Sequence, residues 1–61
     1  MQRTQKLKQI TAVVNRAAEA QVLLENIAAN TSDEVATEIA ALLGVVNLKL
    51  TEYNWRENAQ Q

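Results

Sequence analysis

The chain has 61 residues, with a single glycine and no cysteine, histidine or proline. This length allows one domain, and a domain this small buries only about 60% of the surface that its unfolded chain exposes. Because the residues that form disulfides and most metal sites are absent, association with another chain remains as the means of stabilisation. The net charge of -1 argues against binding that relies on a large overall excess of positive charge.

The sequence shows no sign of a membrane segment. No run approaches the roughly 18 uncharged apolar residues that span a bilayer, and the initial MQRTQKLKQ leads into a polar-interrupted pattern rather than an apolar signal core. We therefore expect a cytoplasmic protein without a membrane partner. The triplet Asn30-Thr31-Ser32 matches the N-glycosylation sequon, which has meaning only in a secretory compartment.

A first helix is predicted over about residues 4–29. Its apolar residues recur at spacings of three and four, as on one face of an amphipathic helix. The stripe consists of Ile10, Val13, Ala17, Ala20, Leu24 and Ile27, widened by Leu7, Val14 and Ala28. Val22 and Leu23 lie off the stripe, and they either cap a bundle or extend an interaction surface.

A turn is predicted at about residues 30–32. Thr31 and Glu34 have the spacing of a capping box, and Ser32 is the alternative cap of the second helix. Asn30 suits the end of the first helix because asparagine tolerates the left-handed conformation. Phosphorylation of Thr31 or Ser32, which acidic residues follow, is the functional alternative, although capping already accounts for these residues.

A second helix is predicted over about residues 33–57. Its main apolar stripe consists of Ala36, Ile39, Leu43, Val46, Leu50 and Tyr53, broadened by Val35 and Leu42. A second, smaller patch lies away from this stripe and consists of Ala41, Gly44, Val45, Leu48 and Trp55. This patch belongs either to a wide or side-by-side oligomer contact or to a docking surface for another protein. A glycine inside a helix indicates close approach of another backbone, and helix bending or simple tolerance are the alternatives.

These elements predict an all-α fold, a two-helix antiparallel hairpin. Arg3, Lys6 and Lys8 should then lie near Glu52 and Glu57. One hairpin covers only part of each stripe, so we expect homodimerisation into a four-helix bundle. The predicted oligomer core is Ile10, Val14, Leu24, Ile39, Leu43, Val46 and Leu50.

The sequence gives little support to catalysis. The acidic residues fall mostly at predicted surface positions, and no histidine or glycine-rich phosphate loop accompanies them. Glu34 and Glu38 share a helix face, but a di-metal site would also need a histidine at a matching position. We therefore predict no catalytic residue, no cofactor and no metal site.

Two kinds of binding function remain. The first is an adaptor, inhibitor or regulator that binds itself and another protein. The second is nucleic-acid binding by a dimer through the basic start of the first helix, namely Arg3, Lys6, Lys8 and Arg16. A dimer of such hairpins resembles, in size and helix pattern only, the plasmid copy-number regulator Rop, which binds paired RNA loops. A purely structural part of a larger assembly is a third alternative.

Overall fold

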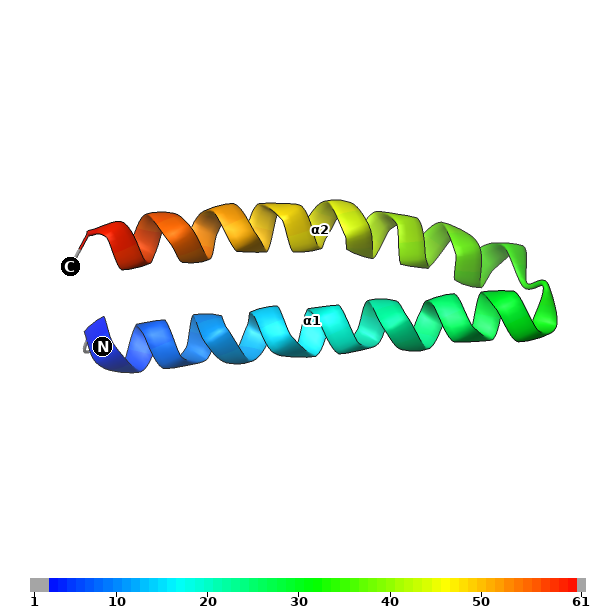
Figure 1. The fold of residues 1–61 in the computed structure, drawn as a ribbon, viewed down its shortest axis with the longest axis horizontal. Coiled ribbons are helices and arrows are strands. Elements are labelled where there is room, and N and C mark those ends of the chain that lie inside the picture. Colours follow the sequence, from blue (N-terminus) through cyan, green and yellow to red (C-terminus); the bar gives the residue numbers. More distant parts are fainter. Residues whose placement is uncertain (1–2, 61) are drawn as a thin grey trace.

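The computed structural model describes residues 3–60, which form two antiparallel helices (Figure 1). Helix α1 spans Arg3–Thr31 and helix α2 spans Glu34–Ala59. They pack along their whole length into a rod of 44 × 15 × 13 Å. The predicted all-α helical hairpin is confirmed. Helix α1 extends beyond its predicted bounds at both ends, whereas α2 begins one residue later and ends two residues later than predicted. Neither helix, over the residues described, combines the length and apolar character needed to cross a membrane.

The connection between the helices is shorter than predicted, and the N-cap of α2 is a different residue from the predicted one. Asp33 caps α2, since its carboxylate accepts hydrogen bonds from the backbone N–H of Val35 at 2.9 Å and of Ala36 at 3.2 Å. Thr31 still belongs to α1, and its hydroxyl donates to the Ile27 carbonyl at 2.6 Å. The predicted Thr31–Glu34 capping box is therefore wrong. A carboxylate at the positive end of a helix is a stronger acceptor than a hydroxyl.

The left-handed residue also differs from the prediction. Ser32 has a φ of 55°, and its N–H donates to the Ala28 carbonyl at 3.0 Å, which closes the end of α1. Asn30, the predicted left-handed residue, remains helical. Ser32 is thus the C-terminal cap of α1 rather than the N-terminal cap of α2, and the chain reverses over Ser32 and Asp33.

The two helices meet along a seam with heptad spacing. The seam residues alternate at intervals of three and four, as in a coiled coil. In α1 they are Leu7, Ile10, Val14, Ala17, Gln21, Leu24 and Ala28; in α2 they are Ala36, Ala40, Leu43, Asn47, Leu50, Asn54 and Glu57. Burial is shallow, because among the described residues no side chain is less than 2% exposed.

The predicted oligomer core is divided between the seam and the surface. Five of its members lie in the seam, and Ile39 and Val46 are 41% and 47% exposed. Small and polar residues such as Ala40 and Asn47 take their places against α1. The apolar stripe of each helix is therefore wider than the seam and turned to one side of it.

Candidate interaction surfaces

One flank of the hairpin carries an exposed apolar surface contributed by both helices. Its residues immediately precede seam residues, and in an antiparallel pair such positions of both helices fall on the same side. We call this surface the open face and define it as Val13, Ala20, Ile27, Ile39, Val46 and Tyr53. Val13, Ile27, Ile39 and Val46 are 41–50% exposed. A surface of this kind on a small rod is typical of an interaction site.

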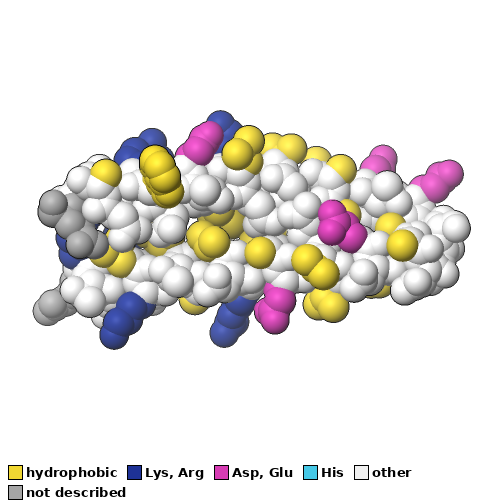
Figure 2. Space-filling model, in the orientation of Figure 1, with side chains coloured by type: hydrophobic (Ala, Val, Ile, Leu, Met, Phe, Trp, Pro, Cys, Tyr) yellow, Lys and Arg dark blue, Asp and Glu magenta, His cyan; other side chains and the backbone are white. Residues whose placement is uncertain are grey.

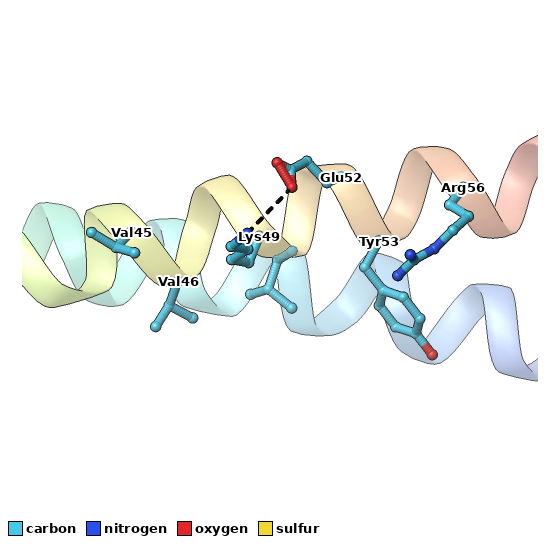
Figure 3. Close-up of a pocket in the computed structure, with 7 residues that line it drawn as sticks. Val45, Val46, Lys49, Glu52, Tyr53 and Arg56 are labelled. Carbon is cyan, nitrogen blue, oxygen red and sulfur yellow. Dashed lines mark ion pairs between the residues drawn. The ribbon is translucent and has the colours of Figure 1, made fainter.

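The open face is hollowed near the end that holds residues 3–10. A groove of about 390 Å³ is lined by residues of both helices, including Val13 of α1 and Leu50 and Tyr53 of α2. A second groove, of about 530 Å³, follows α2 beside Val46 and Tyr53 (Figure 3). Figure 3 shows these two side chains projecting to the same side of α2, with Arg56 beside the tyrosine ring. The open face therefore contains two grooves in addition to its exposed apolar side chains.

Two basic residues of α1 are held by the end of α2. The Lys6 ammonium lies 2.6 Å from the Glu57 carboxylate, and the Arg3 guanidinium donates to the Glu57 backbone carbonyl. Glu57 is only 8% exposed. The hydrogen bond from Lys6 lowers the pKa of Glu57 below its ordinary value, and the same bond raises the pKa of Lys6. This contact joins the ends of the helices, as predicted for Glu57.

Glu52, the other predicted acidic neighbour, behaves differently. It pairs with Lys49 of its own helix at 3.8 Å (Figure 3).

The Tyr53 ring of the open face lies close to two cations. The Lys6 ammonium lies 6.0 Å from the centre of the ring, and the Arg56 guanidinium carbon lies 5.9 Å from it. The aromatic residue of the open face is thus flanked by two cations.

A polar pair occupies the middle of the seam. The Asn47 side-chain amide donates to the Gln21 side-chain oxygen at 2.6 Å and to the Ala17 carbonyl at 3.4 Å. A β-carbon at Gly44 would meet the Gln21 amide nitrogen at 3.4 Å. Gly44 therefore lies against α1 rather than with the predicted patch, and the space beside it holds a side chain. The stripe-based prediction omitted Gln21 and Asn47, although their heptad spacing would have indicated them.

The remaining members of the predicted patch form a second exposed surface on α2. Val45, Leu48 and Trp55 are 59%, 62% and 78% exposed, and Ala41 is also exposed. We call these four residues the outer patch. Seam residues of α2 point to α1, whereas the outer patch lies on the side of α2 away from it. An exposed tryptophan beside aliphatic residues is a frequent anchor of protein interfaces.

The four predicted nucleic-acid contacts are not equivalent. Arg3 and Lys6 bind Glu57, while Lys8 and Arg16 are exposed and are separated by two turns of α1. The predicted basic cluster is thus partly used within the hairpin itself. Two exposed cations of α2, Lys49 and Arg56, lie in the same half of the rod, a contribution that the prediction did not include.

Charge is distributed unequally along the rod. The half that carries the helix ends, residues 3–16 and 48–60, contains all six basic side chains and two acidic ones, for a net charge of +4. The half with the turn, residues 17–47, contains five acidic side chains and no basic one, for a net charge of -5. We call these the terminal half and the turn half. Figure 2 shows the basic side chains gathered toward one end and the acidic ones extending toward the other.

The acidic residues of the turn half do not converge on a point. Within residues 3–60, no group of three carboxylates lies close enough to hold a metal ion.

The chain matches no protein-family model, and it has no significant match among curated proteins or solved structures. Its function is therefore inferred from its own residues.

Proposed function

We propose that this chain is a small non-enzymatic protein-interaction module, an adaptor, inhibitor or regulator, that acts as a homodimer. Two hairpins pack through their open faces into a four-helix bundle, and the outer patch of each copy binds another protein. The observation that carries the proposal is the placement of the exposed large hydrophobic residues. Within residues 3–60, eleven of them are 41–78% exposed, and they include four residues of the open face and three of the outer patch.

The width of the apolar stripe supports the bundle. A helix that contacts one neighbour needs apolar residues at two positions of each heptad, whereas a helix in a bundle contacts two neighbours and needs about three. In α2 the pairs Ile39–Ala40 and Val46–Asn47 show this arrangement, since the first member is exposed and the second faces α1. The larger apolar side chain of each pair is therefore the one that a second hairpin would cover.

The outer patch supports a further protein partner. Leu48 and Trp55 would remain accessible in the bundle, because they lie on the back of α2, whereas Val45 borders the groove that Val46 and Tyr53 line. Trp55, at 78% exposed, has little contact with its own hairpin and serves no evident purpose in its fold. Burial of such a side chain in a partner would return about 1.5–3 kcal/mol.

Charge substitution in the outer patch tests this function. Leu48→Lys and Trp55→Glu should abolish capture of a partner from cell extract and leave helicity and molar mass unchanged. Thr11→Lys, on α1 and on the flank opposite the open face, is the matched control and should keep capture. Proteins retained equally by all variants would show that the outer patch is not a docking surface.

Nucleic-acid binding by the dimer is the second candidate function. The observation that favours it is the concentration of all six basic side chains in the terminal half. Such binding must weaken steeply with salt, because it releases counterions from phosphates. Titration of labelled duplex and loop RNA at two salt concentrations, with Lys8→Gln/Arg16→Gln as the variant, tests it. Absent or salt-independent binding would remove this candidate.

A further inference from the structure

We infer that the partner on the open face is a second copy of this chain packed with its turn at the opposite end, so that each terminal half lies over the turn half of the other copy. This inference rests on the proposed homodimer and specifies its orientation. The same open face would also allow two hairpins to pack with both turns at one end. The distribution of charge along the rod distinguishes the two arrangements.

The area of the flank is sufficient for a second copy. A face of 44 by 15 Å covers on the order of 650 Å², so two hairpins would bury roughly 1,300 Å² in total. Specific protein interfaces begin at about 1,200 Å². A second hairpin has the same length and the same apolar flank, and it therefore covers the face from end to end.

The register within one hairpin fixes which residues lie at the same level. Lys6 lies beside Glu57 and Ala17 lies beside Asn47, so the middle of the rod is near residue 17 of α1 and residue 47 of α2. In the opposite-end arrangement with full overlap, α1 lies over α1 and α2 over α2 of the other copy. Residues at equal distances on either side of the middle then lie at the same level.

This register brings opposite charges together. Arg56 and Glu38 are each nine residues from the middle of α2, so Arg56 lies level with Glu38 of the partner subunit. Arg16 likewise lies close to the level of Glu19 of the partner subunit. All four side chains are exposed. The terminal half, with a net charge of +4, thus faces a turn half with a net charge of -5.

The same-end arrangement brings like charges together. There α1 lies over α2 of the other copy. Each residue of α1 therefore lies level with the same α2 position in the partner as in its own hairpin. Arg16 would lie near the level of Lys49 of the partner subunit, and Lys8 near that of Arg56. Two terminal halves, each with a net charge of +4, would be stacked on each other. Exposed charges act mainly within about 8–10 Å in physiological salt, which is about the spacing of two packed helices.

Distances between spin labels distinguish the arrangements directly. The chain has no cysteine, so a single label can be placed by Asn30→Cys at the turn or by Gln5→Cys at the other end. Both positions are exposed. Asn30 is 13 residues from the middle, and a rise of 1.5 Å per residue predicts a separation of roughly 40 Å in the opposite-end dimer. In the same-end dimer, with helices about 10 Å apart, the two labels would be less than about 25 Å apart.

A mixture of the two labelled variants provides an internal control. In the opposite-end dimer, Gln5 of one copy lies level with Asn30 of the other, so mixing should add a component below about 25 Å. A short distance in the Asn30→Cys dimer alone would overturn the orientation and leave self-association standing. A sample without dipolar coupling, with the molar mass of one chain, would overturn both this inference and the proposed homodimer.

A charge exchange tests the physical cause. Arg56→Glu alone should weaken the dimer several-fold, because it places two carboxylates at the same level. Arg56→Glu combined with Glu38→Arg should restore the dissociation constant and retain the long Asn30 distance. Equal weakening by the single and the double variant would contradict the pairing of terminal and turn halves.

Discussion

The two flanks of the hairpin differ although the same two helices build both. The open face presents valine, isoleucine and tyrosine side chains that are only partly covered. The opposite flank presents two series of residues that recur every seven positions, namely Thr4, Thr11, Ala18, Glu25, Thr37, Gly44, Thr51 and Asn58. The hydroxyls of Thr11, Thr37 and Thr51 each donate to the carbonyl four residues earlier, at 2.9–3.1 Å.

This difference indicates that folding of the hairpin and its association depend on different residues. Three threonine hydroxyls of the opposite flank are satisfied within their own helices, and none of its eight residues has a large apolar side chain, so this flank needs no partner. The open face leaves apolar surface in water, and covering it is favourable. Changes to the open face should therefore act on association, and changes to the seam or turn should act on folding of each hairpin.

The largest effect is expected from a charge on the open face. Val46→Glu loses the burial of a valine in both copies and places a carboxylate in the interface. A loss of about 3 kcal/mol raises the dimer dissociation constant by roughly 100-fold or more. Thr51→Glu adds the same charge to the same helix on the opposite flank and should leave the constant within about threefold. Sedimentation equilibrium measures both, and equal effects would remove the distinction between the flanks.

The next effect concerns the turn. Asp33→Ala removes the acceptor of two backbone N–H groups and should lower the free energy of unfolding by about 1 kcal/mol, within a range of 0.5–2. Thr31→Ala removes a hydroxyl that bonds within α1 and should cost less. Chemical unfolding followed by circular dichroism compares them at one protein concentration. A larger loss for Thr31→Ala would favour the capping box that the sequence predicts.

A smaller effect is expected from the polar pair in the seam. Asn47→Ala and Gln21→Ala each break a hydrogen bond of 2.6 Å between half-buried side chains. A double-mutant cycle should give a coupling of about 0.5 kcal/mol, the low end of the range for a hydrogen bond. Both residues lie in the seam rather than on the open face, so the dimer mass should not change. Additive losses in the two single variants would show that the pair contributes nothing to stability.

The smallest effect is expected at the Lys6–Glu57 pair, because Lys6 is half-exposed. The lowered pKa of Glu57 stabilises the fold above pH 4.5, and this contribution is lost as the pH falls through the folded-state pKa. The raised pKa of Lys6 stabilises the fold below pH 10.5, and this contribution is lost as the pH rises through the folded-state pKa.

Thermal melts of the native chain and Glu57→Gln across pH measure this pair. The difference in melting temperature should be largest between pH 4.5 and 10.5 and should shrink outside that window. Glu52→Gln is the matched control, since Glu52 pairs within α2 at the surface, and its difference should be smaller. A difference for Glu57→Gln that does not vary with pH would show that the ion pair is not its source.

The hairpin and the Lys6–Glu57 contact could be predicted from the sequence because both follow from local patterns. Helix-forming composition and one polar interruption predict two helices, and a short connection makes them antiparallel. The cap was missed because Thr31, Ser32 and Asp33 are all suitable N-caps, and the choice depends on how far α1 continues. The apolar stripe of the first helix ends at Ala28, so it does not indicate that α1 continues to Thr31.

The division of the apolar stripe could not be predicted from periodicity alone. The stripe of α2 is centred between the seam and the open face, and rotation of the helix is set by contacts that a stripe does not specify. Asn47 and Glu57 face α1 because Gln21 and Lys6 bind them there. Polar pairs of this kind fix rotation and register, while the apolar side chains displaced from the seam become the open face.

The molar mass of the folded chain in solution tests the central claim most directly. Sedimentation equilibrium across micromolar concentrations, with helicity recorded on the same samples, should show twice the 6.8 kDa of one chain and a melting temperature that rises with concentration. A well-folded single chain of 6.8 kDa that melts cooperatively and independently of concentration would contradict it.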